Sequence, residues 1–282
     1  MAFQLEQFIA EVVRAMPQFT VAEAVSAATQ LAEPVQLNRY ENFDAVAKLV
    51  SGLQLRSKEE WTGYGYEPDP GATPVEVGDR VYYLATQVNR PEHSHLRLMP
   101  YEEGVREAQR ELITETTAVD RYDGFLRIPK RRITMLGNLW KVGVALTWDD
   151  SREDMLSWLT PGAVPSSGEQ PHPEMTEFDA WFVIRLNPNG GRDIFPEIAR
   201  QVATLTLGDR PVVHVEAEAV SYLVLERLWV PPRLYKSHWF RNYFAGIALP
   251  EGFSWTHVFA AAQQVEDLLR GVTEPVTAEF AE

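Results

Sequence analysis

Apolar residues follow a helical spacing near the start of the chain. The helical period is kept by Phe3, Phe8, Ile9, Val12 and Val13, and Pro17 ends this pattern. Thr20 followed by Glu23 has the spacing of a capping box and predicts the start of a second helix. Asn42 is placed to cap a third, short helix. The pattern therefore predicts a helical N-terminal arm.

The middle of the chain changes to β-branched and aromatic runs that are typical of strands. Strands are predicted at 80–88, 125–128, 133–136, 139–147, 178–186, 203–207, 212–229 and 235–249. Helices are predicted between them at 102–115, 151–159 and 194–201. Gly137-Asn138 is a two-residue hairpin signal. Ser254 is placed to cap a final amphipathic helix, which Gly271 ends.

Strands that follow strands favour an antiparallel sheet over a doubly wound one. The expected fold class is α+β, predominantly an antiparallel β-sandwich or β-barrel, of which a jelly roll is one form, with helices at both ends. Three parts are expected: a helical arm or subdomain at 1–56, a β-rich main domain at 57–253, and a C-terminal helix and tail at 254–282. Two Gly- and Pro-rich stretches, 61–78 and 160–176, are predicted to be long loops.

The formal net charge of −14 changes the range of expected partners. A negative field repels phosphate backbones, so nucleic acid is not expected as a general ligand. No apolar run approaches the length of a transmembrane helix, and the N-terminal residues lack the basic region of a signal peptide. We therefore expect a soluble protein of the cytoplasm or of a virion, with contact to a membrane surface left open.

Candidate chemistry is sparse. The chain has no Cys, which excludes disulfides, thiolate metal sites and a Cys nucleophile, and which is compatible with a thermophilic source. It has no G-x-G-x-x-G, P-loop, G-x-S-x-G or H-E-x-x-H motif. The run Asp149, Asp150, Glu153 and Asp154 lacks the glycine of a calcium loop, and acids at the start of a predicted helix account for it.

His93 and His95 are the first candidate ligands for a divalent metal. Residues two apart on an extended segment project from one face, so both imidazoles could hold one ion. Cupin metal sites have a similar His-x-His pattern, but six residues separate His95 from Glu102 here, and the flanking glycines are missing. The competing interpretation is a polar turn after Pro91.

His214, Glu216 and Glu218 alternate with apolar residues on the predicted strand 212–229. On a strand they would share one face and could bind a metal or carry out acid–base chemistry. The competing interpretation is the solvated face of a sheet. A metal site that combines this group with His93 would require the two strands to be neighbours.

Residues 227–244, here called the basic aromatic segment, contrast with the acidic remainder of the chain. Cationic and aromatic residues are frequent in this segment, and no acid occurs in it. The expected interface residues are Trp229, Arg233, Tyr235, Trp239, Phe240, Arg241 and Tyr243. The competing interpretation places the aromatic side chains in the core and the cations in water.

These features favour a structural, assembly-forming protein, a homo-oligomer or a subunit that binds other structural proteins, most concretely a viral capsid or tail component. The alternative is a metal-dependent, cupin-like β-barrel enzyme that uses His93 and His95. The missing catalytic motifs favour the first.

Overall fold

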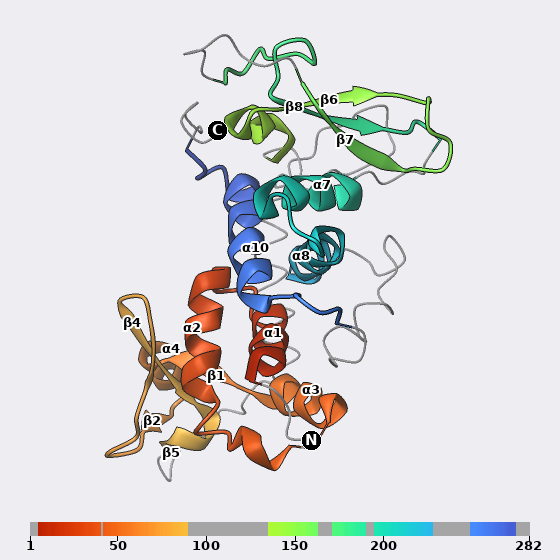
Figure 1. The fold of residues 1–282 in the computed structure, drawn as a ribbon. Coiled ribbons are helices and arrows are strands. Elements are labelled where there is room, and N and C mark those ends of the chain that lie inside the picture. The colour runs from red at the N-terminus through yellow and green to blue at the C-terminus, as the bar shows by residue number, and fades with distance from the viewer. Residues whose placement is uncertain are drawn as a thin grey trace. The chain divides into compact units, whose positions relative to one another are not determined.

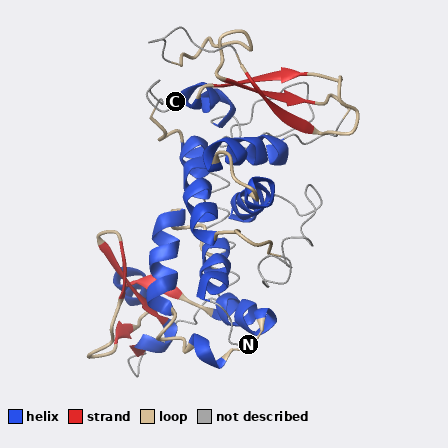
Figure 2. Cartoon of the chain, viewed as in Figure 1, coloured by secondary structure: helices blue, strands red, loops and turns tan. Residues whose placement is uncertain are grey.

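The protein is a mixed α+β structure in this computed structural model (Figure 2). The described residues are 5–40, 42–89, 135–162, 171–189, 195–227 and 249–274. The chain forms two compact units. The first contains the described residues up to 89, together with 226, 227 and 249, and the second contains the others.

Helices make up the core of the first unit (Figure 1). They are α1 (Leu5–Ala15), α2 (Val21–Leu31), η1 (Leu37–Arg39), α3 (Phe43–Gly52), α4 (Lys58–Gly63) and η2 (Ala85–Gln87). Helix α1 packs against both α2 and α3 and buries Phe8 and Val12 completely. The predicted capping box is confirmed. Glu23 Oε2 accepts a hydrogen bond from the backbone N–H of Thr20 at 2.8 Å, and Thr20 Oγ1 accepts one from the backbone N–H of Glu23 at 3.2 Å. The predicted cap at Asn42 is also confirmed.

Two small antiparallel sheets complete the first unit. Their strands are β1 (Leu55–Ser57), β2 (Glu67–Pro68), β3 (Val75–Val77), β4 (Arg80–Leu84) and β5 (Val88–Asn89). The order is β1-β4-β3 in one sheet and β2-β5 in the other. The predicted loop 61–78 is therefore wrong in part, since it contains β2, β3 and the end of α4. Tertiary contacts order this stretch: Trp61 is fully buried and donates from its indole N–H to Tyr83 O at 2.8 Å.

The second unit combines one mixed sheet with three long helices (Figure 1). Its elements are η3 (Leu139–Val142), β6 (Val144–Trp148), β7 (Ser157–Pro161), β8 (Phe182–Leu186), α7 (Phe195–Leu207), α8 (Val213–Arg227) and α10 (Trp255–Arg270). The last two residues of α8 belong to the first unit. Strand β8 lies in the middle of the sheet, parallel to β6 and antiparallel to β7. Residues 149–156 therefore pass the end of β8 on their way from β6 to β7.

The two faces of this sheet bury different residues. Ser157, Ile184 and Leu186 share one face by their register and are buried, and helix α7 packs against β7. Ala145 and Val183 share the opposite face and form a cluster with residues of the segment that precedes β8. Helix α10 packs on α7, so the unit has a layer of helices on one side of the sheet.

Two predicted strands are wrong: 203–207 lies in helix α7, and 212–229 forms helix α8 up to residue 227. Two others are wrong in part, since residues 135–136 of the predicted strand 133–136 are helical and the first four residues of 139–147 form η3. Helix α8 is buried on nearly all sides in its second half. A helix that is apolar all round has no stripe of period 3.6, so its sequence is easily taken for a strand. By contrast, the final helix is confirmed, with Ser254 as its N-cap and Gly271, at φ 75°, as its C-cap.

Two further predictions of local structure are wrong. The predicted hairpin at Gly137-Asn138 is a helical turn that continues into η3, and the chain turns into β6 at Gly143, where φ is +71°. The predicted helix 151–159 is a loop followed by β7. The aromatic Trp158 and the β-branched Thr160 suit a strand, Pro161 is tolerated because β7 lies at the edge of the sheet, and pairing with β8 decides the outcome.

The β-sandwich is not confirmed. Sheets of three, two and three strands occur in the described part of the chain, and none of them closes into a barrel. The predicted helix 102–115, the predicted strand 125–128 and all but the last residue of 235–249 lie outside the described residues. None of the helices in the described ranges is both long enough and apolar enough to cross a membrane.

Candidate functional site

Most of the residues predicted to carry function lie outside the part of the chain that the structure describes. They are His93, His95, Trp229, Arg233, Tyr235, Trp239, Phe240, Arg241 and Tyr243. Their predicted roles in metal binding and at an interface stay predictions. His214 and Glu216 are described.

The predicted shared face of His214 and Glu216 is wrong. Both residues lie on helix α8, where a step of two positions turns about 200° around the axis. His214 is exposed, whereas Glu216 is fully buried. Among the described residues, no group of three His, Cys, Asp or Glu side chains is placed to hold a metal ion.

Glu216 holds the start of helix α10. Its Oε1 accepts a hydrogen bond from the backbone N–H of Ser254 at 2.8 Å, and its Oε2 accepts one from Arg210 Nε at 2.9 Å. At the other end of α10, Lys141 Nζ donates to Thr273 O at 2.9 Å. An acid at the N-terminus and a cation at the C-terminus both stabilise a helix through its dipole. Glu216 is therefore a structural residue.

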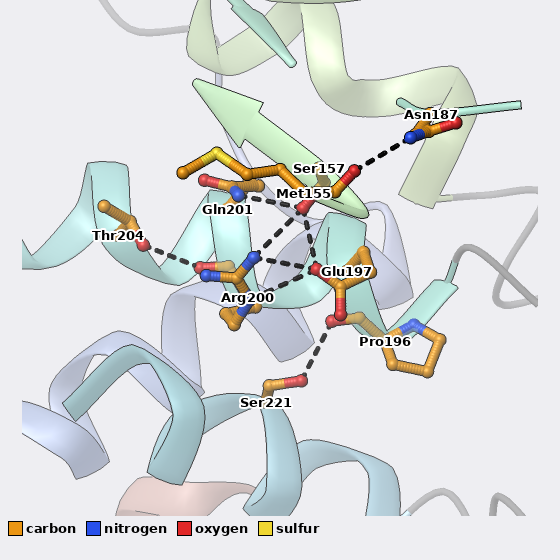
Figure 3. Close-up of polar contacts among 9 residues, drawn as sticks. All are labelled: Met155, Ser157, Asn187, Pro196, Glu197, Arg200, Gln201, Thr204 and Ser221. Carbon is orange, nitrogen blue, oxygen red and sulfur yellow. Dashed lines mark hydrogen bonds and ion pairs between the residues drawn. The ribbon is translucent and has the colours of Figure 1, made fainter. Parts of the chain in front are cut away.

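A cluster of polar side chains joins strand β7 to helix α7 (Figure 3). The hydroxyl of Ser157, which is buried, donates to Glu197 Oε2 at 2.7 Å. Ser157 Oγ in turn accepts hydrogen bonds from Arg200 Nη2 at 3.1 Å and from Gln201 Nε2 at 2.9 Å. Arg200 also binds Glu197 directly, at 2.8 Å. One serine thus links three side chains of α7.

This cluster does not have the form of an activated nucleophile. A serine hydroxyl offers one donor and two acceptor positions, and all three are used at Ser157. An activated serine needs an adjacent general base such as His, whereas the acceptor here is the carboxylate of Glu197, which Arg200 also binds. The cluster therefore fastens the sheet to the helix.

Asn187 anchors the loop between β6 and β7 from the inside. Its side chain is buried, and its Nδ2 donates to Arg152 O at 3.0 Å and to Met155 O at 3.1 Å. Figure 3 shows the bond to Met155. The backbone N–H of Asn187 donates to Leu156 O at 3.0 Å. The backbone of residues 149–156 is thus fixed by the residue that follows β8.

Asp149 fixes the other end of this loop. Its Oδ1 accepts from the backbone N–H of Ser151 at 2.8 Å, and its Oδ2 accepts from Arg185 Nη1 at 3.0 Å. The hydroxyl and backbone N–H of Ser151, followed by the Arg185 guanidinium, hold the pKa of Asp149 below its ordinary value. Asp149 therefore belongs to the internal bonding of the sheet.

The side chains of the loop point to solvent although its backbone is fixed. Trp148 is 61% exposed, Met155 38% and Leu156 51%. Asp150, Glu153 and Asp154 are exposed as well. We call Trp148 together with residues 150–156 the exposed edge. The sequence pattern does not reveal this feature, because acids at the start of a predicted helix need no further explanation.

Arg227 is the one described residue of the basic aromatic segment, and it is buried. Its guanidinium donates to Met16 O at 3.1 Å and also to Val13 O and Phe19 O. These carbonyls lie at the end of α1 and in the turn that follows. Arg227 departs from the core interpretation of the segment, which places the cations in water, and both interpretations of the residues after it stay predictions.

Comparisons of the chain with family models, with curated proteins and with solved structures give no match. Its function is therefore argued from its own geometry. Single apolar residues such as Phe178 and Val272 are also exposed in the described ranges, but the exposed edge gathers three of them, Trp148, Met155 and Leu156, around one loop.

Proposed function

We propose that the protein is a structural, assembly-forming subunit. The observation that carries this proposal is the exposed edge, where Trp148, Met155 and Leu156 present apolar side chains to solvent from a loop of fixed backbone. Aromatic residues and Met are enriched at protein interfaces. A surface that is already ordered loses little conformational entropy on binding, which favours association.

Four buried polar residues are used within the fold itself and leave the exposed edge as the basis of the proposal. Glu216, Ser157, Asn187 and Arg227 are all buried, and each bonds to other groups of the chain in a way that holds two segments together. Burial of these four residues is explained by the bonds that they make.

The most concrete form of the proposal is a capsid or tail component of a virion. Its support is the set of sequence properties described above: an acidic, cysteine-free chain without catalytic motifs. A jelly-roll subunit would need eight strands in two sheets. The described sheets are smaller, so the proposal is one of assembly and does not depend on a jelly-roll fold.

The oligomeric mass of the purified chain tests this function. Light scattering over a range of protein concentrations is expected to show association that strengthens with concentration. Replacement of two apolar residues of the exposed edge, Trp148→Ser with Leu156→Ser, is expected to weaken it. Val81→Ser, at an exposed apolar residue of β4, is the matched control and is expected to associate like the wild type. A strict monomer at every concentration would overturn the proposal.

The metal-dependent enzyme stays the alternative prediction. His93 and His95 lie outside the described residues, and His214 and Glu216 do not share a face. Metal analysis of the purified protein separates the two functions. Stoichiometric zinc, iron or manganese that is lost in a His93→Ala/His95→Ala variant would establish a metal site and count against a purely structural role.

A further inference from the structure

We propose that the exposed edge of one copy binds the basic aromatic segment of a second copy of the same chain. This inference rests on the proposed function, because it names the surface and the partner through which the subunits assemble. Three properties carry it: the charge of the edge, the composition of the segment, and the acidic character of the rest of the chain.

The exposed edge combines apolar side chains with unbalanced negative charge. Asp150, Glu153 and Asp154 are exposed and make no ion pair with another described residue. The loop has one cation, Arg152, whose guanidinium lies 5.7 Å from the Trp158 ring centroid and whose Nη1 is 3.5 Å from Met155 Sδ. A partner of this surface should therefore supply aromatic and cationic groups together.

The chain itself has a stretch of that composition. From residue 228 to residue 250 it contains no acid, and it contains three cations, Arg233, Lys236 and Arg241, among several aromatic residues. Guanidinium groups make strong, often bidentate hydrogen bonds with carboxylates. Trp, Tyr and Arg are the residues that most often dominate binding energy at interfaces. Arg227 is not part of this partner surface, because its donors are used inside the first unit.

Overall charge favours this pair of surfaces over other contacts between copies. The chain carries −14, so two copies repel each other in most orientations. Two exposed edges would oppose acid to acid, which disfavours a symmetric contact of the edge with itself. The contact therefore joins two different surfaces: it gives a two-fold dimer if both pairs form between the same two copies, and a ring or a filament if it repeats head to tail.

A charge exchange between two variants tests the contact in the full-length protein. The first variant, Asp150→Lys/Asp154→Lys, makes the edge less acidic, and the second, Lys236→Glu/Arg241→Glu, reverses cations of the segment. Each variant alone is expected to lose association at least tenfold relative to the wild type. An equimolar mixture is expected to associate again, because every contact between unlike variants then joins opposite charges.

Controls separate this result from misfolding and from a general charge effect. Glu33→Lys/Asp79→Lys changes the net charge as much as Asp150→Lys/Asp154→Lys does, but at exposed residues of the first unit. It is expected to associate at least as well as the wild type. Circular dichroism and thermal unfolding are measured for every variant. If the second variant fails to fold, Arg233→Glu alone takes its place in the mixture.

The failures of the two proposals are distinguishable. If the wild type associates and both variants associate equally well, or if the folded variants do not associate again on mixing, the contact proposed here is wrong and the assembly function stands. A third outcome also overturns the contact. If each variant is less stable than the wild type, the mixture stays monomeric, and the four substitutions combined in one chain restore thermal stability, then the segment binds the edge of its own chain. If the wild type is a monomer throughout, the proposed function itself fails.

Discussion

Arg227 satisfies backbone groups that a helix end leaves without partners. The last carbonyls of α1 have no intrahelical donor, and the buried guanidinium of Arg227 donates to Val13 O and Met16 O. A cation at this end also interacts favourably with the helix dipole. One side chain thus joins residues more than two hundred positions apart in the sequence.

We expect Arg227→Leu to lower the free energy of unfolding by about 3 kcal/mol or more, because it leaves buried carbonyls without donors. Urea denaturation of the full chain measures this change. Arg39→Leu, at an exposed arginine, is the control, and its effect is expected within about 0.5 kcal/mol. Equal effects of the two substitutions would show that the contacts of Arg227 contribute little.

The structural role of an individual residue could be predicted only where its hydrogen bonds are local in the sequence. Thr20, Asn42 and Ser254 were identified as caps because a cap bonds to backbone two or three positions away. Arg227 and Glu216 bond to distant segments, and nothing in their sequence neighbourhood distinguishes them from surface charges. The exposed edge could not be predicted either. The exposure of its side chains depends on how β6, β7 and β8 pair, and this pairing joins segments that are distant in the sequence.

Secondary structure was predicted best for elements with a polar side. Helix α10 alternates buried and exposed residues and has both caps in its sequence, and its predicted bounds agree with the structure. Helix α8 lacks an exposed stripe in its second half, and its sequence therefore predicts a strand. Strand β7 was taken for a helix, since its pairing with β8 is not encoded locally.

Gly162 marks the exit of β7, where only glycine fits. A Cβ atom at this residue would lie 1.9 Å from Ala180 O, a backbone atom that cannot move aside alone. We expect Gly162→Ala to lower the free energy of unfolding by about 2 kcal/mol. Gly137→Ala is the control: a Cβ there meets nothing within 4 Å, and the helical backbone should make it neutral or slightly stabilising. A neutral Gly162→Ala would contradict the close approach of Gly162 to the backbone that precedes β8.

Asp149 gives the sheet a dependence on pH. Bonds to Ser151 and then to Arg185 hold its folded-state pKa below the ordinary 3.8. A carboxylate with a lowered pKa stabilises the folded state above its unfolded pKa, and this contribution is lost as the pH falls through the folded pKa. Asp149→Asn is therefore expected to be less stable than the wild type at pH 7, with a difference that shrinks below about pH 4. Thermal unfolding across this range measures it, and a difference independent of pH would contradict the assignment.

At the scale of the whole molecule, the net charge opposes the self-association that the exposed edge favours. Repulsion between two copies of charge −14 acts over the Debye length, which is about 30 Å at 0.01 M salt and about 8 Å at 0.15 M. The proposed ion pairs between Asp150 or Asp154 and the segment act at contact, where salt screens them less. The two effects therefore depend on salt over different ranges.

This difference predicts an optimum of association at intermediate salt. Added salt first screens the long-range repulsion, so the association constant is expected to rise between about 0.01 and 0.15 M. Towards 1 M, where the Debye length is about 3 Å, the contact pairs are screened as well and association is expected to weaken. Sedimentation velocity over a salt series measures both limbs. An association constant that rises over the whole salt series would show that the apolar contacts of Trp148, Met155 and Leu156 suffice. An association constant that falls over the whole series would show that local attraction outweighs the repulsion of the net charges even at low salt.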